Sequence, residues 1–174
     1  MEINNYKQIS TKRGDSGRSS DYSNKTYSKS DILFNLLGNI DELSSTLGVT
    51  YHYTTFKELI MEIQTRLQDI NSLIATSDDL KKSLIRGILL SDIQLLEKHE
   101  AEILTTTVIK PVFVLPGSDS TLESAYLDLS RSVARRCERS LVDYILTTKR
   151  EDLNFVLQYL NRLSDLLFIM ARNK

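Results

Sequence analysis

Apolar residues recur at three- and four-residue intervals along most of the chain after residue 30, which is the spacing of one face of an α-helix. The ranges that carry this spacing are about 31–47, 56–75, 91–104, 120–146 and 148–172. Only six glycines and two prolines occur in 174 residues, so little interrupts these helices. Five amphipathic helices with short connections predict an all-α fold, a five-helix antiparallel bundle.

Cap signals suggest where the helices begin and end. The candidates are Ser30 before the first helix, Gly48 as its stop, and the capping boxes Thr55/Glu58, Ser120/Glu123 and Thr148/Glu151. Residues 77–90 are expected to be a loop with a short ordered piece. Residues 105–117 are β-branched and close with Pro116-Gly117, which predicts an extended connector.

Composition narrows the class of protein. The formal net charge of −1 excludes the broad basic field of a nucleic-acid binder, so any anion site must be local. The single cysteine, Cys137, fits a reducing compartment. No stretch is apolar enough to span a bilayer, and the first residues lack a signal-peptide pattern. We therefore expect one soluble, cytoplasmic domain over 1–174, with an N-terminal loop region (1–30) and a helical bundle (31–174).

The stretch 130–139 (SRSVARRCER) has two faces when it is read as a helix. The predicted core stripe consists of Leu122, Tyr126, Leu129, Val133, Cys137 and Leu141. Arg131, Arg135 and Glu138 fall on the opposite side, flanked by Arg139 and Asp128. One interpretation is a solvated face, on which the acidic residues relieve the repulsion between arginines. The other is that an anion, such as a phosphate, completes the cluster, because arginine presents a planar fork of donors.

Residues 1–30 contain few apolar side chains, and composition alone favours a disordered tail. Residues 11–20 (TKRGDSGRSS) combine two glycines, hydroxyls and basic side chains. Such a loop could wrap backbone N–H groups around phosphates. It is not a Walker A loop, because the Gly-Lys-Ser/Thr order is missing and no predicted strand precedes it.

Five stretches together resemble the motifs of one family. Residues 11–17 (TKRGDSG) resemble a T-K-x-G-D-x-G loop, and residues 38–45 (GNIDELSS) resemble a G-x-x-D-E-L-[NS]-S helix. Residues 113–117 (FVLPG) are similar to an F-[IV]-L-P-G turn. Residues 131–139 are similar to R-x-x-x-R-R-A-E-R, and residues 159–168 (YLNRLSDLLF) to [FY]-[IL]-N-R-L-S-D-x-[LF]-F. In this order and spacing, the chain resembles the PduO-type ATP:cob(I)alamin adenosyltransferases.

The resemblance implies a homotrimer of five-helix bundles with active sites between subunits. The residues implied to bind ATP are Thr11, Lys12, Arg13, Gly14, Ser19, Ser20 and Lys29 from the N-terminal side, Arg135, Arg136, Cys137 (through its backbone), Glu138 and Arg139 from the helix, and Asn161 at the nucleoside. Glu138 is implied to lie near a bound Mg²⁺. Asp41 is implied to pair with Arg131 across the subunit boundary, and Phe113 to press on the lower face of the corrin ring.

The implied reaction is attack by Co(I) of cobalamin on C5′ of ATP, which forms adenosylcobalamin and releases triphosphate. Arg135, Arg131 and Asp41 are the implied catalytic residues. The substrates are ATP and cob(I)alamin, and the further expected partners are a reductase and an adenosylcobalamin-dependent enzyme, with no nucleic acid and no membrane. The alternative is a non-catalytic carrier or regulator of the same fold that binds nucleotide or corrinoid.

Overall fold

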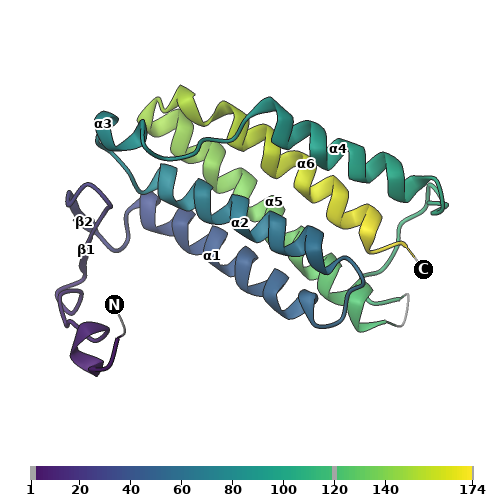
Figure 1. The fold of residues 1–174 in the computed structure, drawn as a ribbon, viewed down its shortest axis with the longest axis horizontal. Coiled ribbons are helices and arrows are strands. Elements are labelled where there is room, and N and C mark those ends of the chain that lie inside the picture. The colour runs from purple at the N-terminus through teal and green to yellow at the C-terminus, as the bar shows by residue number, and fades with distance from the viewer. Residues whose placement is uncertain (1–2, 119–120, 174) are drawn as a thin grey trace.

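The computed structural model describes residues 3–118 and 121–173. Five long helices form the bundle: α1 (Ile32–Tyr51), α2 (Lys57–Ile74), α4 (Leu90–Leu104), α5 (Leu122–Thr148) and α6 (Asn154–Met170). A short helix α3 (Asp79–Lys82) lies between α2 and α4, and the 3-10 turn η2 (Glu151–Leu153) precedes α6. The predicted five-helix bundle is confirmed. Helices α1 and α2 run antiparallel, as do α5 and α6, whereas α4 runs in the same direction as α6 (Figure 1).

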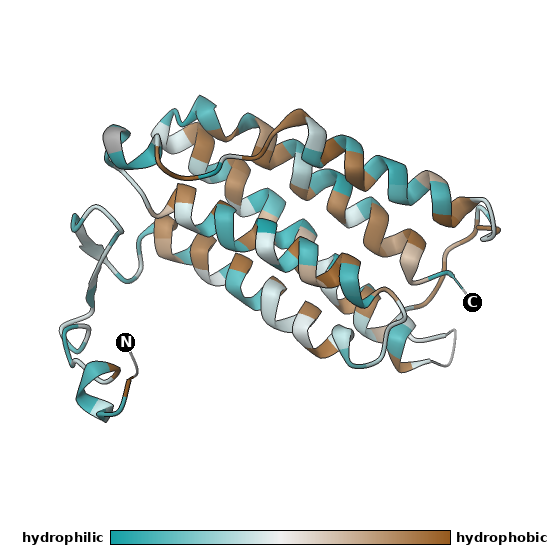
Figure 2. Ribbon diagram, viewed as in Figure 1, coloured by the Kyte–Doolittle hydropathy of each residue, from teal (hydrophilic) through white to brown (hydrophobic). Residues whose placement is uncertain are grey.

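The core is built from the apolar stripes that the sequence predicted. Leucine and isoleucine side chains of all five long helices meet inside, among them Leu36, Ile63, Leu96, Leu141 and Leu163, which are buried. Figure 2 shows the hydrophobic colours concentrated where the helices face one another and the hydrophilic colours on the outside. Burial of apolar surface therefore holds the bundle together. Among the described residues, no helix has the length and apolar composition that crossing a membrane requires.

Two residues of the predicted core stripe on α5 are not in the core. Leu122 and Leu129 are exposed, whereas Leu127 and Ala134 are buried. The helix is 27 residues long and packs against both α1 and α6. A single narrow stripe cannot serve two neighbouring helices, which is the physical reason for the error.

Several cap predictions were wrong, although the helix positions were right. Asp31, not Ser30, caps α1, and its carboxylate accepts a hydrogen bond from the Leu33 N–H. Gly48 lies inside α1, which continues to Tyr51. The N-cap of α2 is Phe56, and Thr148 is the last residue of α5 rather than the cap of α6. Tertiary packing extends α1 and α5 past their local stop signals, because buried neighbours outweigh a few tenths of a kcal/mol of propensity.

The predicted capping box at Ser120 and Glu123 falls partly outside the described residues. Thr121 is the N-cap of α5, and its side chain accepts from the Ser124 N–H. Glu123 instead reaches the connection between α1 and α2, where its Oε1 accepts a hydrogen bond from Thr54 Oγ1 at 2.6 Å. A residue that looked like a local cap is therefore a link between two parts of the bundle.

The N-terminal arm, residues 3–29, lies outside the bundle at the end where α1 begins (Figure 1). It contains the 3-10 turn η1 (Tyr6–Gln8) and a hairpin of β1 (Arg18–Ser20) and β2 (Thr26–Ser28). The strands pair antiparallel with Arg18 opposite Ser28 and Ser20 opposite Thr26. Nearly all of its side chains are exposed, so backbone pairing rather than a core gives the arm its shape.

Candidate functional site

The charged face of α5 borders a cavity of about 350 Å³ between α5, α6 and the residues around the end of α4. Its lining residues are Leu104, Ile109, Arg131, Arg135, Ser164, Asp165, Phe168 and Ile169. Half of the lining residues are apolar; among the others the two arginines supply positive charge and Asp165 supplies one carboxylate. The arrangement suits a ligand that has both an apolar body and an anionic group.

The charged atoms at this face are poorly paired within the chain. Arg135 Nη1 lies 3.5 Å from Ser164 Oγ and 3.7 Å from Glu138 Oε2, and its side chain is exposed. Arg131 Nε and Glu138 Oε2 are buried atoms that have no hydrogen-bond partner among the described residues. Buried polar atoms are normally hydrogen-bonded, so a group from outside this chain fits here.

The predicted residue Arg136 is held differently. Its Nε donates to Asn39 Oδ1 at 3.1 Å, and its guanidinium forms an ion pair with Glu42 on α1. Asn39 also donates from Nδ2 to Ser140 Oγ at 2.8 Å. Asn39 and Glu42 were not among the predicted site residues, although both lie in the GNIDELSS stretch. Their contacts fix Arg136 against α1, beside the more loosely held Arg135.

Cys137 is a buried thiol rather than a reactive one. Its Sγ–H donates to the Asn39 carbonyl at 3.1 Å. Burial raises the pKa of this thiol to about 12, which keeps it protonated at neutral pH. The side chain is therefore not a nucleophile, and only its backbone is available for the predicted role.

One of the two interpretations placed Asp128 on a solvated face beside the arginines, and its burial shows that the solvated position is wrong. The residue is only 1 % exposed, and both of its carboxylate oxygens accept from Arg172 Nη2 at 2.7 Å. Arg131 Nε lies 3.8 Å from the same carboxylate. Asp128 thus ties α5 to the end of α6 and lies directly behind Arg131.

The predicted residues of the arm come together among themselves. The Lys29 N–H donates to the Gly17 carbonyl at 2.9 Å, which closes the base of the hairpin. A side chain at Gly14 could not be accommodated without movement, because its Cβ would lie 2.7 Å from Lys29 Nζ. Lys29 and the loop 11–17, which carries Lys12 and Arg13, therefore form one exposed, basic surface, and the half-buried Ser19 lies in the adjoining strand β1.

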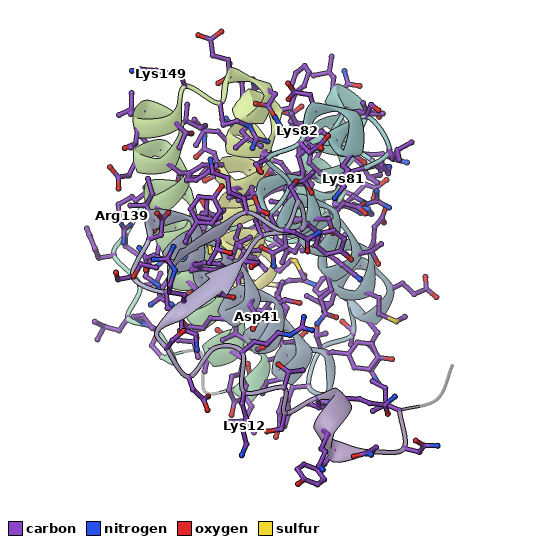
Figure 3. The ribbon with its side chains drawn as sticks, turned by 90° about the vertical axis from the view of Figure 1, so that its left-hand side faces the viewer. Lys12, Asp41, Lys81, Lys82, Arg139 and Lys149 are labelled. Atoms are coloured by element: carbon purple, nitrogen blue, oxygen red, sulfur yellow. The ribbon has the colours of Figure 1, made fainter. Side chains whose placement is uncertain are left out.

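This basic surface and the arginines of α5 do not meet within one chain. Over residues 3–118 and 121–173, no hydrogen bond or ion pair joins the arm to Arg135, Arg136, Glu138 or Arg139. Figure 3 shows Lys12 at the outer end of the arm and Arg139 well away from it on α5. Asn161, on α6, lies one turn before Ser164, whose hydroxyl donates to the Asn161 carbonyl at 2.9 Å.

Asp41 and Arg131 also lie on different surfaces of the chain. Asp41 is exposed on α1 and lines an open groove of about 940 Å³ between α1 and α2, which also contains Gln64 and Gln68. Arg131 faces the cavity beside α6. Glu42, the residue after Asp41 on α1, pairs with Arg136 instead. The two residues could therefore pair only between two copies of the chain.

Phe113 is fully exposed in the irregular connector between α4 and α5. Phe113 is therefore not part of the bundle core. Val112 and Leu115 beside it are exposed as well. Exposed apolar side chains grouped in one segment are typical of a surface that another molecule covers.

Comparison with known proteins gives one consistent answer. The sequence profile of the cobalamin adenosyltransferase family matches residues 9–174. The corrinoid adenosyltransferase MMAB of Homo sapiens is 37 % identical, over 95 % of this chain and 68 % of that protein. The corrinoid adenosyltransferase of Citrobacter freundii is 36 % identical, over 95 % of this chain and 93 % of that one.

Solved structures agree with the sequence comparison. A phenylalanine-to-alanine variant of the PduO-type ATP:corrinoid adenosyltransferase from Lactobacillus reuteri, complexed with cobalamin and ATP, superposes with a TM-score of 0.84. It is 29 % identical, and the match covers 95 % of this chain and 92 % of that one. An arginine-to-lysine variant complexed with ATP has a TM-score of 0.81 at 28 % identity, over 93 % and 91 % of the two chains. The chain belongs to the cobalamin adenosyltransferase family.

Proposed function

We propose that this chain transfers the 5′-deoxyadenosyl group of ATP to cob(I)alamin and releases triphosphate. One observation carries the assignment: Arg131 and Arg135 line an otherwise mainly apolar cavity and present charged atoms that the chain itself leaves poorly paired. A polyanionic leaving group next to an apolar ring system matches that combination. Membership of the family, and its relatives complexed with ATP and cobalamin, support the same choice of substrates.

The chemistry needs little from the protein beyond position and charge. The electron pair of Co(I) attacks C5′, a Co–C bond forms, the C5′–O bond breaks, and cobalt is formally oxidised to Co(III). Because cobalt supplies the nucleophile, a protonated, buried Cys137 is no obstacle. The arginines stabilise the negative charge that develops on the departing triphosphate, as preorganised donors do in other transfer reactions.

We assign the nucleotide to two surfaces that different subunits contribute. The arm supplies Thr11, Lys12, Arg13, Gly14, Ser19, Ser20 and Lys29, and α5 supplies Arg135, Arg136, the backbone of Cys137, Glu138 and Arg139, with Asn161 at the nucleoside. The lack of contact between these surfaces within one chain supports sharing between copies. The homotrimer remains a prediction, and sedimentation of a monomer at micromolar concentration would contradict it.

Asp41 and Arg131 are the proposed charge pair across that boundary. Asp41→Asn removes the charge and keeps the shape of the side chain. We therefore expect activity to fall about tenfold while the melting temperature of the helical bundle stays the same. The sedimentation profile should shift toward smaller species as the protein is diluted. Unchanged kinetics and unchanged sedimentation would count against this pair.

A magnesium ion is part of the proposal. Over the described residues no group of three or more His, Cys, Asp or Glu side chains could hold a metal by itself. Glu138 fits as a single carboxylate ligand, because its buried Oε2 lacks a hydrogen bond, and Mg²⁺ commonly takes one carboxylate together with phosphate oxygens and water. When bound, the ion would neutralise charge on the triphosphate. A cytoplasmic location, a partner reductase and an acceptor enzyme for the product also remain predictions.

The deciding experiment mixes the protein with MgATP and chemically reduced cob(I)alamin. We expect the absorption of Co(I) to be replaced by that of adenosylcobalamin, with one triphosphate released per Co–C bond. The alternative of a non-catalytic carrier predicts binding of either ligand without that spectral change. Hydrogen exchange over residues 11–20, with and without MgATP, tests the arm, because a nucleotide should slow exchange there.

A further inference from the structure

The turn of the β1–β2 hairpin contains the one side chain of the arm that is buried among the described residues. Asp21 directly follows β1 and is 7 % exposed. Its Oδ1 accepts hydrogen bonds from the backbone N–H groups of Ser23 and Lys25, both at 2.8 Å. Its Oδ2 accepts from Ser77 Oγ at 2.6 Å and from the Tyr27 hydroxyl at 3.3 Å. Four donors thus converge on one carboxylate.

Two of these bonds shape the turn, and the bond from Ser77 fastens it to the bundle. Ser77 lies just after α2, 56 residues further along the chain. Other contacts join the same two places. The Tyr22 N–H donates to the Ala75 carbonyl at 2.7 Å, and Ser23 Oγ accepts from the N–H of Ser77 at 3.1 Å. Figure 1 shows the hairpin beside the end of the bundle where α2 finishes.

The β1–β2 hairpin connects this attachment point on the bundle to the loop 11–17, which we assign to ATP binding. Ser19 and Ser20 are the two residues immediately before Asp21, in β1. The strands are paired as far as Arg18 and Ser28, and the Lys29 N–H then bonds the Gly17 carbonyl. Over the described residues, the loop 11–17 has no hydrogen bond to the bundle helices. Its position therefore depends on the hairpin, and the hairpin's position depends on its turn.

We propose that Asp21 is a positioning residue for the nucleotide site: it locks the hairpin turn to the end of α2 and so holds the loop 11–20 where it meets ATP. The proposal rests on the proposed function of that loop. Asp21 does not touch the nucleotide in this arrangement. Without the Asp21 carboxylate, the loop should occupy its ATP-binding position for only a fraction of the time. The apparent affinity for ATP should fall in proportion to that fraction. Chemistry in the assembled site should change little.

The test measures Asp21→Ala against the wild type with MgATP and cob(I)alamin. We expect the KM for ATP to rise about tenfold, kcat at saturating ATP to stay within about threefold, and the KM for cob(I)alamin to stay within about twofold. Hydrogen exchange over 18–28 should accelerate while that of α1, α5 and α6 does not. Asp21→Asn should lie closer to the wild type, because its Oδ1 still accepts from Ser23 and Lys25.

Ser77→Ala removes the hydroxyl on the bundle that donates to Asp21. Because it deletes only this hydroxyl, the variant remains informative if Asp21→Ala folds poorly. It should raise the KM for ATP by a smaller factor, and the double variant should be no worse than Asp21→Ala alone, because both remove one interaction. Thr105→Ala is the matched control. Its hydroxyl also follows a helix end but bonds only the Glu102 carbonyl of its own helix, and its kinetics should equal those of the wild type.

An unchanged KM for ATP in Asp21→Ala, with faster exchange in the hairpin, would overturn the proposal, because the attachment would then have no role in binding. An equal loss in kcat and in both KM values, with a lower melting temperature, would reduce Asp21 to a structural residue and also overturn it. Direct titration with MgATP separates the two hypotheses. If the wild type binds ATP but forms no Co–C bond, the proposed function fails, and weaker ATP binding by Asp21→Ala still supports the positioning role.

Discussion

Helix α5 carries two sets of polar groups that are satisfied in opposite ways. Asp128 is buried with both of its carboxylate oxygens bonded to Arg172 Nη2, and the Cys137 thiol bonds a backbone carbonyl of α1. By contrast, Arg131 Nε and Glu138 Oε2 are buried without hydrogen bonds, and Arg135 has only long contacts. The paired groups hold the bundle together, whereas the unpaired groups are placed for a ligand that the chain does not contain. This contrast predicts which substitutions reduce stability and which reduce activity.

Arg135→Ala should have the largest effect, and the effect should be on activity. If this guanidinium stabilises the departing triphosphate, its removal should lower kcat by about a hundredfold to a thousandfold, the usual loss for one such donor. The melting temperature should not change, because the side chain is exposed. Steady-state kinetics and a thermal melt measure both.

Arg135→Lys keeps the charge but loses the planar fork, so it should recover only part of that activity. Lys98→Ala removes an exposed positive charge on α4 and serves as the control. If Arg135→Ala were destabilised and only slightly less active, the contrast between the paired and the unpaired polar groups of α5 would be broken.

Asp128→Ala should give the converse result, a large loss of stability. Removing one partner of a buried pair leaves the other charge uncompensated and typically costs about 3–5 kcal/mol. Urea unfolding of this variant measures the loss. Asp143→Ala, which removes an exposed carboxylate from the same helix, should stay within about 0.5 kcal/mol of the wild type. A small loss in Asp128→Ala would mean that the Asp128–Arg172 pair contributes less to stability than its geometry suggests.

Phe113→Ala extends the comparison between stability and activity from charged groups to an apolar side chain. Truncation of a buried phenylalanine costs about 3–5 kcal/mol, but a fully exposed one should cost almost nothing. If Phe113 covers the lower face of cobalt, water or a base could coordinate in the variant and make Co(II) harder to reduce. Activity that starts from Co(II) should then fall more than activity with pre-reduced Co(I), while the KM for ATP stays the same.

Leu84→Ala removes another strongly exposed apolar side chain, at the other end of the bundle, so it is the matched control for Phe113→Ala. It should alter neither assay. Equal losses with Co(II) and Co(I) in Phe113→Ala would remove the proposed cobalt-face role.

Glu100 tests whether every buried polar atom without a hydrogen bond marks a place where a ligand binds. Its Oε1 is buried without a hydrogen bond, and burial together with the charge of Asp165 raises the pKa of this carboxyl to about 7. A proton can therefore satisfy this group at neutral pH. Because the folded-state pKa lies above the ordinary value of 4.5, the associated stability is complete at low pH and is lost as pH rises through about 7.

Glu100→Gln cannot ionise, so it should melt at the same temperature as the wild type near pH 4.5 and at a higher temperature above pH 7. Solvent screening at this partly exposed site should limit the difference in stability to about 1 kcal/mol. Melts from pH 4.5 to 8 measure it, with Asp143→Asn as a surface-carboxylate control. A gap that does not change with pH would mean that Glu100 stays ionised and needs an external partner after all.

The sequence alone determined the helices and the family. Helical periodicity is a local property, repeated over many turns, so α1, α2, α4 and α5 could be placed to within a few residues, whereas α6 begins at Asn154, six residues after its predicted start. Single caps such as Thr55 and Thr148 could not, because one local signal is weaker than the packing of a whole helix. The five motifs indicated the family because their order is preserved in the chain itself.

Only the tertiary structure decided which polar groups are paired. Asp128 meets Arg172 across 44 residues, Arg136 meets Asn39 across 97, and Asp21 meets Ser77 across 56. No local pattern encodes such pairs, because each depends on how two helices, or a hairpin and a helix, come to rest against each other. For the same reason the sequence could not tell that Asp128 is interior, that Phe113 is exposed, or that the arm and the arginines of α5 do not meet within one chain. Packing distributes burial and exposure, and burial determines which charges need a partner.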